Sequence, residues 1–349
     1  MQTSGKGMGA FYYSEAIEKN TKYRQDYENG IQLFLQKKKL KADRQRKSFI
    51  NPRAYMEEPE TYRNRLIDML GFPLREEKEM PVLQEKIFVA TDKNVNIYRY
   101  QFALLGDLKL YGLYFEQVER PKDKPFIIGL HGGHGTPELV SSIHGNSANY
   151  NHLIRRMTDR GANVFVPQLL LWDKQSYGGE YNREHIDGKL RQLGGSITAL
   201  EIYCLQRELD YFIEFEKVDK DRVAVAGLSY GGMYAVHLAA VDTRIKACYS
   251  CSWVNDSFVH SWADWSYLNA QYTFTAAEIV AMIAPRVLVV AMGNKDELFD
   301  YQLTEKCCEY VRGYYEYLQR EERFKCVIYE GLHELDKGEE ELNFFFSYL

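Results

Sequence analysis

The segment Arg222–Met233, which reads RVAVAGLSYGGM, constrains the fold more than any other part of the chain. Its apolar run predicts a strand, its glycines predict a tight turn, and the residues that follow predict a helix, with Ser229 at the apex of the turn. Glycines two residues before and two residues after Ser229 leave room for neighbouring backbone. We therefore expect the Ser229 hydroxyl to be exposed at a sheet edge in a strained turn. The alternative is a glycine- and serine-rich turn without chemistry.

From about residue 80, short apolar runs alternate with helical stretches such as 198–216 and 300–319. The predicted strands are an antiparallel pair at Ile97–Phe102 and Lys109–Phe115, then Phe126–Leu130, Val164–Pro167, Val223–Ala226, Lys246–Ser250, Arg286–Met292 and Lys325–Tyr329. This alternation predicts an α/β fold in which a mostly parallel central sheet is covered by helices on both faces. Ligands of such sheets bind at the carboxyl ends of the strands, so the loops at those ends are the candidate site.

Residues 1–80 have a different character, being polar, rich in charged residues and tyrosine, and periodic in the helical sense. One predicted helix face holds Tyr23, Tyr27, Ile31, Phe34 and Leu35. A second helix is predicted at Pro59–Leu70. We therefore expect an N-terminal helical extension over 1–80, with a surface for homo-oligomer formation, and a catalytic domain over 81–349. The basic run at 37–47 is interpreted as a solvated helix face rather than a patch for an anionic surface.

Composition limits the partners that we expect. The chain has 349 residues, 45% of them hydrophobic, and a net charge of −5, which fits a soluble globular protein and argues against nucleic acid as a partner. The first 30 residues hold no apolar stretch long enough for a signal peptide or a membrane span, so we expect a cytoplasmic protein that does not bind membranes. Cys248 and Cys251 fall in a predicted strand and Cys307-Cys308 in a predicted helix, so we interpret them as core thiols. We expect no metal and no cofactor.

A serine hydroxyl becomes a good nucleophile only when a neighbouring base takes its proton. His333, in the loop after the last predicted strand, is the candidate base, and a surface histidine is the alternative reading. The base in turn needs a carboxylate that fixes its tautomer. Asp296 follows the strand Arg286–Met292 closely and is favoured over Glu297, which faces the wrong side of the turn, and over Asp300, which is better placed to cap the next helix. The order Ser229, Asp296, His333 is that of α/β-hydrolases.

An acyl-transfer site also needs two N–H groups that stabilise an oxyanion. The backbone of Tyr230, at the start of the helix after Ser229, is one candidate donor. The second is Gly133, in the loop HGGHG at 131–135, whose glycines allow close approach of backbone to substrate. This loop lacks the ending of a phosphate-binding loop and has no further metal ligands nearby, so we expect His131 to shape the loop by hydrogen bonding.

Two aromatic insertions interrupt the alternation of strands and helices, near 172–195 and 252–275. We expect them to form a cap and a rim over Ser229. Trp172, Trp262 and Trp265 are the candidate substrate-binding residues, because indole faces suit sugar rings and acyl groups. A cap that packs on the core for stability alone is the equal alternative.

Residues 80–349 resemble the α/β-hydrolase superfamily, and within it the dienelactone hydrolase-like and acetyl xylan esterase-like branch of serine esterases. The resemblance rests on His131-Gly132-Gly133, Gly227–Gly232, Ala240–Ala247, Ile283–Arg286 leading to Asp296, and His333. It implies hydrolysis of short acyl esters, often acetyl groups on carbohydrates, without a metal. The nucleophile is serine rather than the cysteine of true dienelactone hydrolases, which argues against lactone hydrolysis. The expected cytoplasmic location favours acylated oligosaccharides or small metabolites over polymeric xylan.

Two other functions fit part of this pattern. A serine peptidase of the prolyl oligopeptidase type shares the catalytic domain, but it usually carries a large propeller that 80 N-terminal residues cannot form. A non-catalytic binding protein on a hydrolase fold is the second alternative, and the presence of all three triad candidates argues against it.

Overall fold

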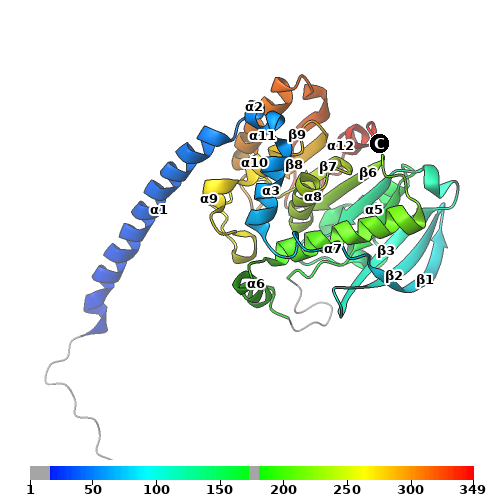
Figure 1. Ribbon diagram of the computed structural model, residues 1–349, viewed down its shortest axis with the longest axis horizontal. Helices are drawn as coiled ribbons and strands as arrows, with labels where there is room; N and C mark the ends of the chain where they lie inside the picture. The colour runs from blue at the N-terminus through cyan, green and yellow to red at the C-terminus, as the bar shows by residue number, and fades with distance from the viewer. Residues whose placement is uncertain (1–15, 146, 173–180) are drawn as a thin grey trace, which may run out of the picture.

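The computed structural model describes residues 16–145, 147–172 and 181–349. In this part of the chain the strands form one nine-stranded sheet in the order β1-β2-β3-β5-β4-β6-β7-β8-β9 (Figure 1). The strands are β1 (Val82–Asp92), β2 (Val95–Leu104), β3 (Leu108–Gln117), β4 (Phe126–Leu130), β5 (Asn163–Pro167), β6 (Val223–Leu228), β7 (Ile245–Cys251), β8 (Val287–Gly293) and β9 (Phe324–Tyr329). Strands β4 to β9 pair in parallel, whereas β1, β2 and β3 are antiparallel to their neighbours. The mostly parallel sheet expected from the sequence is confirmed.

Twelve α-helices surround or precede the sheet in the described residues. They are α1 (Thr21–Phe49), α2 (Pro52–Glu57), α3 (Pro59–Leu70), α4 (Pro137–Val140), α5 (Leu153–Thr158), α6 (Arg183–Gln192), α7 (Ile197–Tyr211), α8 (Tyr230–Val241), α9 (Ala270–Thr273), α10 (Ala276–Ala281), α11 (Tyr301–Tyr317) and α12 (Glu340–Phe346). A π-helical turn at Phe212–Glu216 continues α7. No described helix has the length and apolar character needed to cross a membrane.

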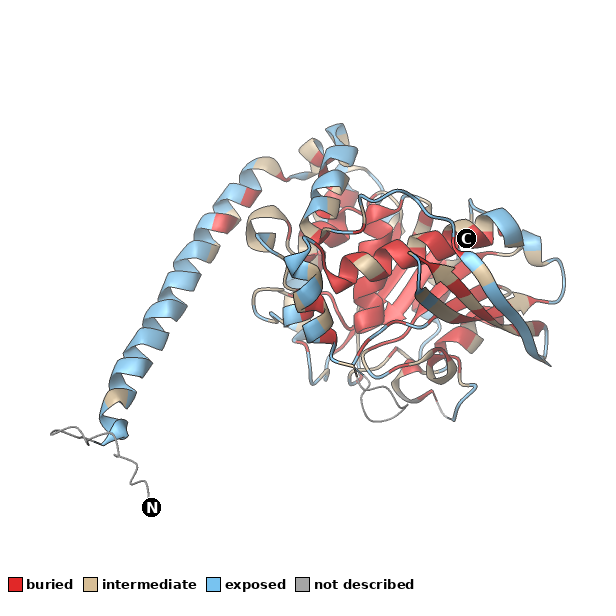
Figure 2. Ribbon diagram, turned by 60° about the horizontal axis from the view of Figure 1, so that its bottom comes forward, coloured by how far each residue is buried: buried red, intermediate tan, exposed pale blue. Residues whose placement is uncertain are grey.

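Helices pack on both faces of the sheet. Successive residues of its central strands point to opposite sides, so each strand contributes side chains to both faces. In β4, Phe126 and Ile128 belong to one hydrophobic cluster and Ile127 belongs to the other. The first cluster includes residues of α2, α3, α7, α8, α10 and α11, and the second includes residues of α5 and α12. Helix α8 is buried along its whole length, as its red ribbon in Figure 2 shows. The carboxyl ends of the parallel strands are thus held on a rigid scaffold.

Strand β1 was not predicted from the sequence. Eight of its 11 residues are exposed, including Ile87 and Phe88, because it is the edge strand of the sheet. Such a strand lacks the continuous apolar run that identified the inner strands.

The N-terminal helices make unequal contacts with the rest of the protein. Helix α1 is exposed along most of its length and extends away from the sheet (Figures 1 and 2), and Tyr23 and Tyr27 on its predicted apolar face are 72% and 75% exposed. Tyr55 of α2 and Leu66 of α3 are buried in the main core. The basic run of α1 is not wholly solvated, since Arg46 is buried and pairs with Glu278 of α10 at 2.8 Å.

Glu208 of α7 provides a pH-dependent test of the core. It is buried, has no ion-pair partner among the described residues, and has a pKa raised well above the ordinary value by burial. A carboxyl whose pKa is raised in the folded state destabilises the protein when the pH exceeds the pKa of that carboxyl in the unfolded state, because ionisation then opposes folding. We expect Glu208→Gln to raise the urea midpoint of unfolding at pH 7, and the gain to disappear as the pH falls below the ordinary carboxyl pKa of about 4.3. Glu316→Gln, at an exposed position, is the control. A gain for Glu208→Gln that is equal at pH 7 and below the ordinary carboxyl pKa would contradict the prediction.

Candidate active site

Ser229 lies between β6 and α8 in a strained backbone conformation, with φ of 60° and ψ of −122°. Residues other than glycine rarely adopt this region, at a cost of about 1–3 kcal/mol. The turn is held from both sides, because the Ser229 N–H donates to the carbonyl of Cys251 at 2.8 Å and its carbonyl accepts from the Met233 N–H at 2.9 Å. The expected strained turn at the end of a strand is therefore present, but the expected exposure is wrong, since Ser229 is only 7% exposed and follows an inner strand of the sheet.

The flanking glycines are required by close backbone contacts. A Cβ at Gly227 would lie 2.4 Å from the backbone of Gly231, and a Cβ at Gly231 would lie 2.3 Å from the carbonyl oxygen of Leu130. No side chain fits at such distances, so both positions must be glycine for the turn to close. This close approach also brings the end of β4 next to the turn.

His333 and Asp296 contact each other, although 37 positions separate them in the sequence. Asp296 follows β8 and His333 follows β9, and these two strands are parallel neighbours. The distance from His333 Nδ1 to Asp296 Oδ2 is 2.8 Å, and the side chain of Asp296 is fully buried while that of His333 is 10% exposed. A carboxylate at Nδ1 holds the imidazole in the tautomer that leaves Nε2 free to accept a proton.

The surroundings of Asp296 favour its ionised form. Burial alone would raise its pKa, but the hydrogen bond and the charge of His333, together with the N–H groups of Leu298 and Phe299, lower the pKa of Asp296 below its ordinary value. The two competing carboxylates have other roles. Asp300 accepts from the Gln302 N–H as the N-cap of α11, and Glu297 accepts from the backbone N–H of His333 at 3.2 Å. Only Asp296 of the three contacts the imidazole.

Two hydrogen bonds and a close backbone contact connect the His333 loop to the Ser229 turn. Asn149 Nδ2 donates to the carbonyl of His333 at 3.1 Å, and the next residue, Tyr150, accepts through its hydroxyl from the Gly132 N–H at 2.7 Å. A Cβ at Gly132 would lie 3.3 Å from Ser229 Cβ, so the Gly132 backbone lies against the serine. In the described part of the chain, no hydrogen bond joins Ser229 to His333 directly. Such bonds often tighten only when substrate is bound.

Neither candidate oxyanion donor uses its N–H group for a hydrogen bond within the described residues. Tyr230 is the first residue of α8, where no helical partner exists for its N–H and where the helix dipole favours negative charge. The Gly132 N–H is used by Tyr150, whereas the Gly133 N–H has no partner among the described residues. The carbonyl of Gly133 accepts from the Trp172 N–H at 2.8 Å, which fixes the plane of the following peptide.

His131 is a structural residue of the glycine loop, as its predicted role requires. Its Nδ1 donates to the carbonyl of Gly132 at 2.9 Å and its Nε2 accepts from the Leu169 N–H at 2.9 Å. Complete burial lowers the pKa of His131 to about 4, so the ring is neutral at pH 7. No group of three His, Cys, Asp or Glu side chains that could hold a metal ion lies in the described ranges.

The three candidate tryptophans form one aromatic cluster with Tyr230. Trp262 stacks on Trp265 at 4.4 Å between ring centroids, and Trp172 lies 4.8 Å from Trp262 and 5.1 Å from Tyr230. Trp172 is 36% exposed and Trp262 is half-buried, whereas Trp265 is only 6% exposed and its indole N–H donates to the His260 carbonyl. Phe299 extends the cluster to His333, at 5.7 Å between rings. Residues 173–180 of the first predicted insertion, including Tyr177, Gly178 and Gly179, lie outside the described residues.

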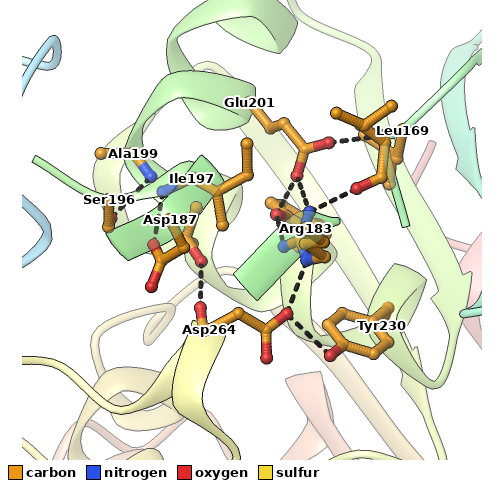
Figure 3. A network of polar contacts seen from close by, with 12 residues as sticks. Leu169, Arg183, Asp187, Ser196, Ile197, Ala199, Glu201, Tyr230 and Asp264 are labelled. Carbon is orange, nitrogen blue, oxygen red and sulfur yellow. Dashed lines mark hydrogen bonds and ion pairs between the residues drawn. The ribbon is translucent and has the colours of Figure 1, made fainter. Parts of the chain in front are cut away.

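A buried network of charges contacts Tyr230, and no sequence motif predicts it. The Tyr230 hydroxyl donates to Asp264 Oδ2 at 2.8 Å, and Arg183 donates to the same oxygen at 2.5 Å and to Glu201 at 3.1 Å (Figure 3). Tyr234, one turn after Tyr230 in α8, donates to Glu201 and accepts from Arg183. The four elements that supply these residues are far apart in the sequence, so no local motif marks the network.

Asp296→Asn tests whether the carboxylate orients His333. An amide of the same size keeps the shape but changes which tautomer of the ring is favoured, so we expect kcat for p-nitrophenyl acetate to fall by about 10⁴-fold while folding is retained. Asp300→Asn is the matched control, because asparagine caps a helix as well as aspartate does and kcat should change little. An Asp296→Asn enzyme within tenfold of wild type would contradict the role of this residue.

The family model for acetyl xylan esterase (AXE1) matches residues 73–254, just over half of the chain, and this range includes Ser229 and Gly133. The chain belongs to the acetyl xylan esterase family. Members of this family are carboxylic ester hydrolases, and the class of enzyme expected from the sequence is thereby confirmed. Asp296 and His333 lie beyond the matched range.

Among curated proteins, this acetyl xylan esterase family member is 32% identical over 114 residues to YtaP of Bacillus subtilis (strain 168), described as a hydrolase. That match covers 30% of this chain and 38% of YtaP. It is also 29% identical over 140 residues to serine carboxypeptidase-like 31 of Arabidopsis thaliana, covering 37% of this chain and 26% of that protein. The chain thus spans well under half the length of these curated relatives.

Solved structures show the same fold at low sequence identity. A protein described as an acetyl xylan esterase from Bacteroides fragilis matches with a TM-score of 0.67 and 16% identity, covering 86% of this chain and 83% of that one. A glucuronoyl esterase from Solibacter usitatus matches with a TM-score of 0.64 and 14% identity over 86% and 94% of the two chains. Acetyl xylan esterase 1 from Thermoanaerobacterium sp. JW/SL YS485 has a TM-score of 0.56 and 16% identity over 84% and 94%. These likenesses confirm the α/β-hydrolase fold.

Proposed function

We propose that this protein is a serine esterase that hydrolyses short-acyl esters, acetyl esters of carbohydrates in particular, through a covalent acyl-enzyme. Ser229 is the nucleophile, His333 the general base and acid, and Asp296 the residue that orients His333. The observation that carries the proposal is the 2.8 Å contact of Asp296 with His333, in a loop that hydrogen bonds and a close backbone contact connect to the strained turn of Ser229.

The reaction begins when Ser229 Oγ attacks the ester carbonyl and His333 Nε2 takes the hydroxyl proton. The carbonyl oxygen becomes an oxyanion, which accepts hydrogen bonds from the N–H groups of Gly133 and Tyr230. The carbon–oxygen bond to the alcohol then breaks, and His333 returns the proton to the leaving alkoxide. Water repeats the sequence on the acyl-enzyme, which releases the carboxylic acid and restores Ser229.

Two features support a carbohydrate ester as substrate. The family match is to acetyl xylan esterase, and the half-exposed faces of Trp172 and Trp262 lie beside Tyr230, the residue that follows the nucleophile. Indole faces pack well against the C–H faces of sugar rings. The buried and stacked Trp265 offers less surface, so we assign contact with the sugar to Trp172 and Trp262 first.

The proposal is tested by assaying p-nitrophenyl acetate, acetylated xylo-oligosaccharides and a peptide amide side by side with the wild-type protein. We expect turnover of both esters and none of the peptide. Turnover of the peptide at a comparable kcat/KM would favour the peptidase alternative, and no turnover of any of the three would favour a non-catalytic binding protein.

A further inference from the structure

A cavity of about 520 Å³ lies under the cap, apart from the triad candidates. It is lined by the cap segment 253–274, by His237 of α8, by the start of α10, and by Gln32 and Leu35 of α1. Ser229, Asp296 and His333 are not among its lining residues. Figure 1 places α9, which carries part of this lining, beside α1 and α3. The volume is in the range of ligand pockets, which is about 300–1,000 Å³.

Four polar atoms of this lining are buried without a hydrogen-bond partner: His237 Nε2, Asn255 Oδ1, His260 Nε2 and Gln271 Oε1. They are half of all such side-chain atoms in the described residues, of which there are eight. Buried polar atoms are usually paired, because an unpaired one costs about 1–3 kcal/mol. Their concentration in one cavity marks a place where a bound molecule would find hydrogen-bond partners.

The hydrogen-bond types of three of these atoms, on His237, Asn255 and Gln271, can be assigned. His237 Nδ1 donates to the carbonyl of Met233 at 2.8 Å, so in the neutral ring Nε2 is an acceptor. Burial lowers the pKa of His237 to about 4, which keeps the ring neutral at pH 7. Asn255 uses its NH₂ group for the Trp253 carbonyl, so the free Oδ1 is an acceptor, as is the free Oε1 of Gln271. The ligand must therefore bring hydrogen-bond donors.

The rest of the lining combines aromatic residues with small polar and aliphatic ones, and it carries no full charge. Trp253 and Tyr267 lie against the His237 ring, at 5.4 Å and 6.0 Å between centroids, and Trp265 also lines the cavity. The Tyr267 hydroxyl already donates to Thr198, so it adds no free donor. No Asp, Glu, Lys or Arg is among the lining residues, so a buried ionic ligand would have no counter-charge.

The geometry points to a binding pocket for a neutral polyhydroxylated ligand, a single sugar ring, held by hydroxyl donors to His237, Asn255 and Gln271 and by aromatic faces. This inference goes beyond ester hydrolysis, since it assigns a second site that binds sugar without any reaction at Ser229. Trp265 belongs both to this pocket and to the aromatic cluster beside Tyr230, which makes it the wall between the two sites.

The test is titration of the full chain with D-xylose and D-glucose, in which binding is detected by calorimetry or saturation-transfer NMR. These probes contain no ester, so their binding does not depend on the proposed esterase. We expect saturable binding to wild type, weakened about tenfold (about 1.4 kcal/mol) by Gln271→Met and by Asn255→Leu and unchanged by the exposed control Gln84→Met. A crystal soaked with D-xylose should show the sugar within hydrogen-bond distance of His237 and Gln271.

Stability separates a binding role from a structural one. Gln271→Met removes an acceptor that has no partner among the described residues, together with one long hydrogen bond of 3.4 Å from Gln271 Nε2 to Ser257. Its thermal midpoint without sugar should therefore stay close to that of wild type. Absence of saturable binding, binding that neither cavity variant weakens, or a cavity that holds only waters after soaking would each overturn the inference. Binding of choline but not of the sugars would overturn the assignment of a neutral ligand.

Discussion

Ser229→Ala is expected to lower kcat for p-nitrophenyl acetate by about 10⁴-fold or more while the protein remains folded. The hydroxyl oxygen is the atom that forms the covalent bond, and no other group in the described site can replace it. In the proposed mechanism the oxyanion donors are the backbone N–H groups of Gly133 and Tyr230, which the substitution leaves in place and which would account for a residual rate. Alanine at position 229 adopts the same strained φ of 60° as serine, so the unfolding free energy should change little.

The matched control is Ser250→Ala, in the neighbouring strand β7. The Ser250 hydroxyl is buried and donates to the Gly232 carbonyl at 3.0 Å, so its removal should cost about 1 kcal/mol of stability and leave kcat nearly unchanged. The comparison separates loss of the nucleophile from loss of any buried serine near the turn. A Ser229→Ala enzyme that retained more than a tenth of wild-type kcat would exclude Ser229 as the nucleophile.

Arg183→Met is expected to give the largest loss of stability, about 3–5 kcal/mol in urea unfolding, because it leaves buried carboxylates without their counter-charge. The Arg183 side chain is 3% exposed and donates to Asp264, Glu201, the Tyr234 hydroxyl and the Leu170 carbonyl. Burial alone would lower the pKa of Arg183, but Tyr234, Glu201 and Asp264 raise it well above the ordinary value, so the guanidinium stays charged.

Two further variants make this prediction specific. Arg53→Met breaks the exposed pair Arg53–Glu57, whose side chains are 75% and 61% exposed, and should cost less than about 1 kcal/mol. Adding Glu201→Gln and Asp264→Asn to Arg183→Met removes the stranded charges and should recover part of the loss. A loss below about 1 kcal/mol for Arg183→Met, or no recovery in the triple variant, would contradict the account of this network.

The inner part of the fold could be predicted because its strands are continuous apolar runs bounded by turns. The predicted strand Phe126–Leu130 matches β4 residue for residue, and Arg286–Met292 differs from β8 by one residue at each end. The exposed edge strand β1 has no such run and was missed. For α1, periodicity predicted the helix and its apolar face, but nothing local indicates that Arg46, within a basic run, is buried against Glu278.

The triad candidates could be chosen because each follows a predicted strand, and parallel neighbouring strands end at the same edge. The contact of His333 with Asp296 agrees with that choice, as does the use of Asp300 as a helix cap. The supporting network of Arg183, Glu201 and Asp264 could not be predicted, because it depends on how the cap segment folds back onto α7 and α8. The unpaired acceptors of the cavity could not be predicted either, because they depend on how side chains pack in the folded protein.

The most direct test of the central claim is labelling of the full chain with a fluorophosphonate, with the modified residue located by peptide mass spectrometry. The reagent forms a covalent bond only with an activated hydroxyl. The account predicts a single adduct on Ser229 in wild type, which His333→Ala loses or forms far more slowly. An unlabelled but folded wild-type protein, or an adduct on another residue, would contradict it.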